Sequence, residues 1–492
     1  MKLPLLDSLV FFGLTLGNII LGISFYFRNK TTEQFTAGGR RLPAWVVGMS
    51  IFATFVSSIS FLALPGKAYM TNWNAFVFSL SIPVASIMTV RLFIPLYRRI
   101  GNISAYYYLE QRFGTWARIY ASVCYILTQL MRTGAILMLL ALPLNALFGW
   151  NIKTVIILTG FTVMLYTVLG GIKAVIWTDA IQGIILITGA VVCALILTFS
   201  LPEGPGQLFR IAIANHKFSP GSFSASLTES TFWVVLVYGL FINLQNYGID
   251  QNYVQRYMTT STDKAAKAST LFGSLLYIPV SFIFFYIGTA LFSYYTARPD
   301  LLPDDLRIEG AGDMVFPYFI ATGLPAGVTG LLIAAIFAAG MSTISTSLNS
   351  TATIVLNDYY KRHINKNAGE RSSMRVLYST SFITGIIGIL IALALVGVES
   401  ALDAWWSLAS IFSGGMLGLF LLGYFSKKAG RTDALIGVII GVIVIIWMSL
   451  SPLVFNEGIA FRSPFHSNLT IVFGTTTIFL TGFLLARLIR KK

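Results

Sequence analysis

Hydroxyl side chains form a regular column between residues 339 and 350, inside a long apolar segment. With 3.6 residues per helical turn, Ser342, Ser345 and Thr346 share one helix face, and Ala339 lies one turn earlier on the same side. Lipid gives hydroxyls no partner, so this face must meet another helix, water or an ion, and oxygen ligands suit a small hard cation such as Na+. The same hydroxyls could instead bond back to their own helix or serve as small packing residues, and the residues alone leave both interpretations open.

Two ionisable side chains fall inside predicted membrane helices. Arg132 lies in the middle of segment 117–143, where a guanidinium costs about 2.5–3.5 kcal/mol, so it should face a wet cavity or an anion. A carboxylate substrate would pair with it through two hydrogen bonds, whereas carbonyls and waters could satisfy it in a structural role. Asp179 opens segment 178–200 and could be a helix cap, or the anionic ligand of a cation that hydroxyls also hold.

Two of the predicted helices contain polar interruptions near mid-membrane. In segment 43–66, Ser57 and Ser60 lie three residues apart on one face and precede a Pro-Gly pair, so we expect the helix to unwind and expose carbonyls there. In segment 231–248 we expect a second break where the run is interrupted by Asn243, Gln245, Asn246 and Gly248. Asp250 follows directly and is interpreted as an interface or gate residue.

The elements that position these residues follow from composition. With 56% hydrophobic and 11% charged residues and a mean hydropathy of +0.76, the chain of 492 residues is predicted to be an all-α, multi-pass protein of the cell membrane. About thirteen apolar runs have spanning length, at about 5–27, 43–66, 75–97, 117–143, 152–169, 178–200, 231–248, 269–293, 326–359, 374–398, 402–425, 433–454 and 468–487. An odd number of spans places the termini on opposite sides.

Basic residues predict the orientation. Of the 34 lysines and arginines, 24 fall on the side that holds the C-terminus, including Arg118 and Arg256, and eight on the other. The positive-inside rule therefore predicts an external N-terminus and a cytoplasmic C-terminus. The net charge of +15 is then a matter of orientation and lipid headgroups, and gives no argument for nucleic acid.

Other motifs exclude several classes of protein. Cys124 and Cys193 lie in apolar segments and suggest neither a disulfide nor a metal site. No phosphate-binding loop is present, so uphill transport would draw on an ion gradient. The spans hold neither a metal pattern nor a nucleophile–base set, so an enzyme is not expected.

The organisation predicted from these spans is a single membrane domain over residues 1–492. An extra helix at 5–27 precedes two consecutive five-helix sets, 43–200 and 231–425, and two further helices follow at 433–487. Because each set has an odd number of spans, the second enters the membrane from the opposite side, which is the inverted repeat of secondary transporters.

Four ordered blocks carry a family resemblance over nearly the whole chain: Phe52 to Phe61, Gly170 to Gly183, Gln251 to Tyr257 and Ala338 to Ser350. The chain resembles the sodium:solute symporter family, and within it the bacterial sodium-coupled sialic acid transporters. The resemblance implies a LeuT-like fold that imports a small organic solute with Na+ by alternating access.

The resemblance also implies three groups of site residues. A first Na+ would be held by Ala53, Val56, Ala339, Ser342 and Thr343. A second Na+ would be held by Ser342, Ser345, Thr346 and Asp179. The solute would meet Ser57, Ser60, Ser79, Arg132 and Asn243, with Arg132 and the serines near its carboxylate.

Departures from the family pattern leave the solute open. Ser79 stands where the sialic acid transporters have a pocket glutamine, Ala75 and Gly239 replace two pocket phenylalanines, and Ser60 replaces a threonine. These changes predict a roomier, less aromatic pocket, so the solute could be sialic acid, another sugar acid, another carboxylate or a neutral sugar. A membrane sensor of the same fold and coupling to protons through Asp179 are the alternatives. Beyond the solute and membrane lipid, no obligatory protein partner is expected.

Overall fold

The computed structural model describes residues 4–26, 30–307, 312–396, 415–456 and 459–488, and within these ranges it is all-helical with no strand. The first half contains α1 (Leu5–Ser24), α2 (Thr32–Ala37), η2 (Gly38–Arg40), α3 (Ala44–Phe55), α4 (Ser58–Met70), η3 (Asn74–Phe76), α5 (Val77–Leu80), α6 (Ile82–Met88), η4 (Thr89–Phe93), α7 (Ile94–Ile100), α8 (Tyr107–Phe113), α9 (Thr115–Phe148), α10 (Ile152–Phe199) and α11 (Pro205–Ala214). The second half contains α12 (Phe232–Ile249), α13 (Gln251–Tyr257), α14 (Asp263–Ala297), η5 (Pro299–Leu301), η6 (Asp304–Leu306), α15 (Gly312–Thr322), α16 (Val328–Ile354), η7 (Val355–Ile364), α17 (Glu370–Ala394), α19 (Met416–Phe425), α20 (Arg431–Val454), η8 (Ser467–Leu469) and α21 (Thr470–Leu488).

Many of these helices can cross a membrane, as predicted. Ten are long and apolar enough among the described residues, and the bent pair α3–α4 makes eleven. α10 alone has 48 residues, about 72 Å of helix, which is more than two bilayer cores. It is two helices joined at Gly171, whose φ of 57° is favoured by glycine. Of the predicted segment 402–425, residues 402–414 lie outside the described residues.

The predicted break in the second membrane helix is confirmed. α3 and α4 are bent by 54° relative to each other, and Val56 and Ser57 between them have extended backbone dihedrals. The Ser57 hydroxyl accepts a hydrogen bond from the backbone N–H of Ser60 at 3.4 Å, so it caps the new helix.

The second break lies elsewhere than predicted. α12 runs without interruption through Asn243 and Gln245 to Ile249, and the break comes at Asp250. The Asp250 carboxylate accepts a hydrogen bond from the Asn252 N–H at 2.7 Å and so begins α13. The Asn243 amide instead donates to Ser81, in another part of the bundle, which explains why polar residues alone gave the wrong position.

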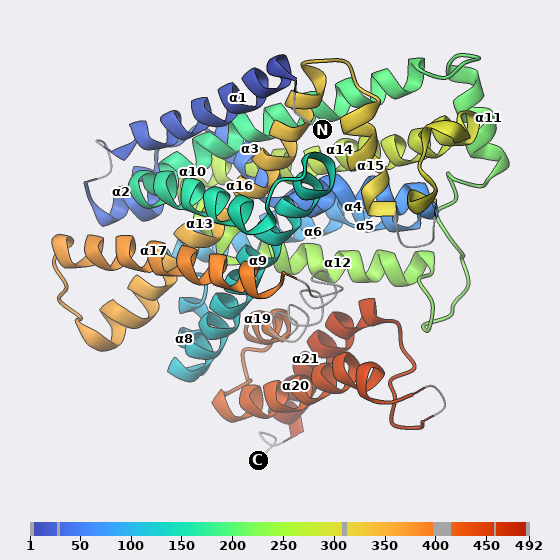
Figure 1. Cartoon of the computed structure of the whole chain (residues 1–492). Coiled ribbons are helices and arrows are strands. Elements are labelled where there is room, and N and C mark those ends of the chain that lie inside the picture. Colours follow the sequence, from blue (N-terminus) through green and yellow to red (C-terminus); the bar gives the residue numbers. More distant parts are fainter. Residues whose placement is uncertain (1–3, 27–29, 308–311, 397–414, 457–458, 489–492) are drawn as a thin grey trace.

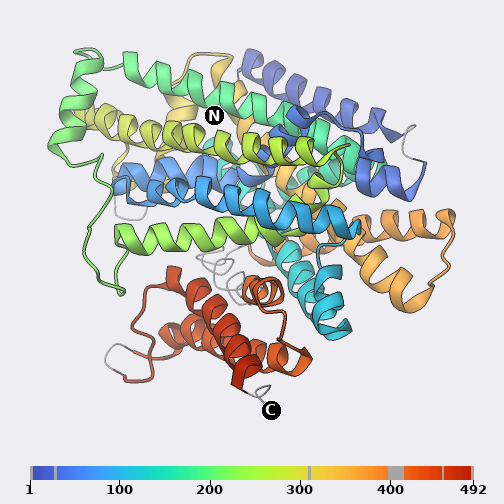
Figure 2. The same cartoon turned by 180° about the vertical axis from the view of Figure 1, so that it is seen from behind.

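α16 lies in the middle of the bundle, where α1, α3, α9, α10 and α17 contact it (Figure 1). Nearly every residue from Thr329 to Ile354 is buried. The hydroxyl column therefore faces protein on all sides rather than lipid. α19, α20 and α21 form a group of their own, which packs against α12 (Figures 1 and 2).

Connecting segments gather at two opposite ends of the bundle. α2 and the turn between η7 and α17 lie at one end, and α11 and α15 lie at the other (Figures 1 and 2). At the first end Arg118 donates to Glu110 and to Asp358, both at 2.6 Å, and Arg362 also pairs with Glu110. These ion pairs join α8, α9 and η7.

Candidate functional site

The end of α3 exposes backbone carbonyls toward α16. Because the chain leaves the helix at Val56, the last four carbonyls of α3, from Ala53 to Val56, lack the usual N–H donors four residues on. The Ser60 N–H that would have bonded the Val56 carbonyl is instead taken by Ser57. Ala53 and Val56, both predicted for the first Na+ site, thus have carbonyl oxygens free of helical bonds.

α16 supplies the other predicted groups of this site. The Ser342 hydroxyl lies 2.9 Å from the Ala53 carbonyl oxygen and 3.0 Å from that of Ala339, and it can donate to either. Thr343 donates to the Ala339 carbonyl at 3.1 Å. Four of the five predicted residues are thereby brought together where two helices meet.

The chemistry of this oxygen set fits a small monovalent cation. All of its groups are neutral carbonyl or hydroxyl oxygens, which are hard ligands. The C-terminal end of α3 also carries the negative end of the helix dipole. An ion with a single positive charge can be held there without a carboxylate, and this donor set offers no nitrogen or sulfur.

The predicted second site is built around a buried ion pair that the sequence analysis missed. The Asp179 Oδ2 atom accepts hydrogen bonds from the Ser50 hydroxyl and from Arg256 Nη2, both at 2.7 Å. The same Nη2 atom donates to Thr346 at 2.6 Å, and Ser345 donates to the Ser342 carbonyl at 3.1 Å.

Arg256 is therefore not a loop charge, as the count of basic residues took it to be. Its side chain is completely buried, and so is that of Asp179. Nε donates to Ser50 at 2.8 Å and Nη1 donates to the Asn252 carbonyl at 2.6 Å. The polar block Gln251 to Tyr257 was the available signal, because an ordinary loop does not require such a pattern. Its burial, however, depends on contacts with distant helices.

This ion pair changes what the second site can do. A guanidinium already satisfies Asp179 Oδ2 and Thr346, two of the predicted ligand residues. Asp179 Oδ1 is buried and has no hydrogen-bond partner among the described residues. The carboxylate therefore keeps one free oxygen, which would have to serve any second cation.

Several of the predicted solute residues gather around a cluster of aromatic rings. Phe55 stands at its centre, and the rings of four others surround it: Phe78, Tyr247, Tyr253 and Tyr277. Ser60 lies beside the Tyr277 hydroxyl, and Ser79 donates to Ser281 at 2.9 Å. The serines of α4 and α5 thus line the same aromatic wall.

Asn243 approaches the same region from α12. Its Nδ2 donates to the Ser81 hydroxyl at 3.0 Å, while its Oδ1 is buried without a partner among the described residues. Arg132 belongs to α9. Among the charged side chains, Arg132 has the largest electrostatic effect on Asp250, and its charge also acts on Tyr253. Arg132 is therefore close enough to the break between α12 and α13 for its charge to act there.

The predicted extra room at Gly239 is wrong. A Cβ atom built at this position would lie 2.8 Å from the Ser81 hydroxyl and 2.9 Å from the Phe78 carbonyl oxygen. α12 therefore approaches α5 and α6 closely, and the helices occupy the space that a phenylalanine would fill. At this position there is therefore no added room for a solute.

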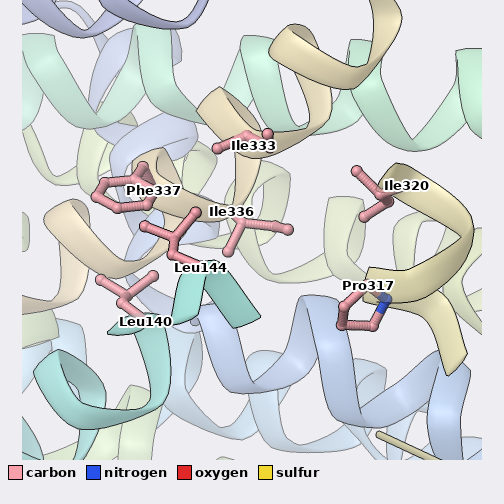
Figure 3. Close-up of a pocket in the computed structure, with 7 residues that line it drawn as sticks. All are labelled: Leu140, Leu144, Pro317, Ile320, Ile333, Ile336 and Phe337. Carbon is pink, nitrogen blue, oxygen red and sulfur yellow. The ribbon is translucent and has the colours of Figure 1, made fainter. Parts of the chain in front are cut away.

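One cavity between α9, α15 and α16 is unrelated to these residues (Figure 3). It is lined by Leu140, Leu144, Pro317, Ile320, Ile333, Ile336 and Phe337. Its volume of about 10 Å³ leaves room for about one water molecule. Its apolar lining offers nothing to a polar solute.

Similarity to known proteins extends over most of the chain. Residues 35–441 match the model of the sodium:solute symporter family. The chain is 36% identical to the sodium/sialic acid symporter SiaT of Proteus mirabilis, over 89% of this chain and 88% of that protein. It is 34% identical to the sodium/sialic acid symporter NanT of Aliivibrio fischeri, over 87% and 84%. A solved structure of a Na+-coupled sialic acid symporter in a substrate-bound outward-open state matches with a TM-score of 0.91 and 33% identity, covering 99% of this chain and 98% of that one.

Proposed function

The chain belongs to the sodium:solute symporter family, and from this we infer that it imports an acidic sugar of the sialic acid class. Na+-coupled symport across the membrane is the activity of this family, so Na+ is the coupling ion and the protein is a transporter rather than an enzyme. The observation that carries Na+ coupling is the convergence of the Ala53, Ala339 and Ser342 oxygens at the broken α3–α4 helix. The solute class is inferred from relatives that are sodium/sialic acid symporters.

The first Na+ site is assigned to Ala53, Val56, Ala339, Ser342 and Thr343. Bound there, Na+ supplies a positive charge that draws the end of α3 against α16. The Ser342 hydroxyl already contacts carbonyls of both helices, so the two elements need little rearrangement to form the site. Holding α3 in place also fixes Ser57 at the start of α4, which is the means by which ion binding prepares the solute site.

The second Na+ site is assigned to Asp179, Ser342, Ser345 and Thr346. Its support is the free Oδ1 atom of a fully buried carboxylate. Moving one charge through the membrane potential contributes about 2.3 kcal/mol per 100 mV, and a tenfold gradient contributes about 1.4 kcal/mol. One Na+ supports a solute ratio of several hundredfold, and a second Na+ keeps the import of a monoanion electrogenic.

The solute site is assigned to Ser57, Ser60, Ser79, Arg132 and Asn243. Ser60 and Ser79 present hydroxyls beside the aromatic wall, and Asn243 offers an unused acceptor. These groups suit the hydroxyl and amide groups of a sugar acid. The Arg132 guanidinium suits a carboxylate because it can form two parallel hydrogen bonds.

A neutral sugar is the second candidate, and one observation favours it. Among the charges that act on the Asp250 carboxylate, that of Arg132 has the largest effect. If that carboxylate balances Arg132 during transport, the site has no excess positive charge for an anionic solute. An acidic solute must therefore compete with Asp250 for the guanidinium.

The same inference extends to the topology. We assign thirteen spans, an external N-terminus and a cytoplasmic C-terminus. Support for a bundle that crosses the membrane comes from the connecting segments, which gather at two opposite ends. Residues 43–200 and 231–425 are assigned to the two inverted repeats, each beginning with a broken helix. The chain works in lipid as a single domain and needs no obligatory protein partner.

Thermal unfolding of the purified protein tests this function. N-acetylneuraminic acid should raise the melting temperature in Na+ but not in K+, and neutral sugars should not. Arg132→Ala should abolish the shift, and Arg132→Lys should restore only part of it. A shift of equal size in K+ would contradict Na+ coupling, whereas a Na+-dependent shift with neutral sugars alone would reject the acidic solute and leave symport intact.

A further inference from the structure

The side chain of Gln182 is an unused polar group in the core of the transporter. It is only 1% exposed, and neither its amide oxygen nor its amide nitrogen has a hydrogen-bond partner among the described residues. A buried amide without hydrogen bonds is destabilising, because it has lost the water molecules that it bound in the unfolded chain. Such a residue points to a ligand that completes its contacts.

Gln182 lies where the second Na+ site needs an oxygen. It follows Asp179 by three residues in α10, so both side chains project from one helix face. The Tyr166 hydroxyl lies close to the Gln182 and Ser345 side chains, and it donates to the Met341 carbonyl at 3.4 Å. Gln182 and Ser345, which lie on different helices, are therefore close to the same hydroxyl group.

The electrostatics of the site explain why a further neutral ligand is needed. Arg256 already balances the charge of Asp179, so a Na+ ion beside this pair leaves one net positive charge in a buried site. That charge must be offset by dipoles, because burying an unpaired charge is costly. An amide carbonyl is a hard oxygen ligand of the kind that alkali and alkaline-earth ions use. Arg256 holds Oδ2, which leaves the Oδ1 side of Asp179 for the ion.

We propose that Gln182 is a further ligand of the second Na+ site, acting through its amide oxygen together with Asp179 Oδ1 and the Ser345 hydroxyl. This inference rests on the proposed second site. The Asp179 carboxylate then bridges Arg256 on one oxygen and Na+ on the other. The Gln182 nitrogen remains available to the Tyr166 hydroxyl oxygen.

Equilibrium binding of 22Na+ to the purified transporter tests this assignment without relying on transport. Wild-type protein should bind two Na+ ions. Gln182→Leu should lose one ion or raise the half-saturating Na+ of that ion at least tenfold, while the other ion binds as before. Gln182→Glu should lower that half-saturating concentration at least threefold, because a carboxylate is the stronger ligand. A glutamine that only fills space would let Gln182→Leu keep both ions at wild-type affinity.

Matched variants separate the possible failures. Gln129→Leu removes another buried amide, which accepts from Ser347 on a different face of α16, and it should leave both ions in place. If Asp179→Asn loses one ion and both Gln182 variants bind Na+ like wild type, the role of Gln182 is refuted and the second site stands. If Asp179→Asn and Gln182→Leu both keep two ions, the second site is itself misplaced, and failure of Na+ binding in the wild type would refute the proposed function.

Discussion

Removing the buried guanidinium of Arg256 should destabilise the protein strongly. Its four hydrogen bonds reach Ser50, Asp179, Asn252 and Thr346. Arg256→Met keeps most of the side-chain volume but leaves the Asp179 carboxylate buried without a positive partner. Breaking a buried ion pair in this way costs about 3–5 kcal/mol. Losses from the remaining hydrogen bonds overlap with this figure and should not be added to it in full.

Removing both charges should restore most of the lost stability. In Arg256→Met combined with Asp179→Leu no uncompensated charge remains, and apolar replacements of buried ion pairs are often neutral or stabilising. The two single variants should therefore be about 3–5 kcal/mol less stable than wild type, while the double variant should be within about 2 kcal/mol of it. The coupling energy from such a cycle should reach several kcal/mol.

Unfolding in mixed detergent micelles, followed in K+, measures these four proteins. Na+ should then be added to Arg256→Met, where the free carboxylate is expected to bind it more tightly and recover part of the stability. A single-variant cost below about 1 kcal/mol, or a double variant whose loss equals the sum of the two, would refute the ion pair as the organising contact. Equal Na+ stabilisation in wild type and Arg256→Met would refute the link between the pair and the ion site.

Three other expectations follow from the same contacts. Ser342→Ala should raise the half-saturating Na+ for thermal stabilisation at least tenfold, because it removes the hydroxyl that contacts both helices, and unchanged Na+ dependence would reject the first site. Ser57→Ala should lower the free energy of unfolding, measured without solute, by about 0.5–2 kcal/mol through loss of the α4 cap. The control is Ser24→Ala, whose hydroxyl bonds within α1. Burial raises the pKa of Glu110, but Arg118 and Arg362 outweigh it and hold the pKa below its ordinary value. The stability from Glu110 should be present above about pH 4.3, fall away as pH drops through the lower folded pKa, and be absent from Glu110→Gln, whose acid unfolding curve should be flatter.

Local signals explain which parts of the fold were predictable. The break at Val56 and Ser57 was visible because Ser57 caps the next helix through a local hydrogen bond, whereas Pro65 lies inside α4 and does not interrupt it. The second break was misplaced because the Asn243 amide in α12 donates to Ser81, in another part of the bundle, while Asp250 stops the helix by capping the next one. Amide side chains thus mark polar contacts more reliably than they mark helix ends.

Long-range pairing explains what the sequence could not reveal. Arg256 and Asp179 are 77 residues apart, and nothing near either residue shows that they meet. α13 is only seven residues long, so it lacks the apolar run that marks a spanning helix, and its arginine was counted with the loop charges. The closure of space at Gly239 was equally hidden, because it depends on how closely α12 approaches α5 and α6.

The hydroxyl column of α16 shows that its two initial interpretations are compatible. Ser342, Thr343 and Ser345 each reach a carbonyl of their own helix, as the structural interpretation expects. Such a bond uses the single hydroxyl proton and orients the oxygen lone pairs away from that carbonyl. A cation needs only the lone pairs, so back-bonding prepares these oxygens as ligands instead of competing with the ion. A variant that keeps the hydroxyl, such as Ser345→Thr, should therefore weaken Na+ binding less than Ser345→Ala, and equal losses in the two would contradict this argument.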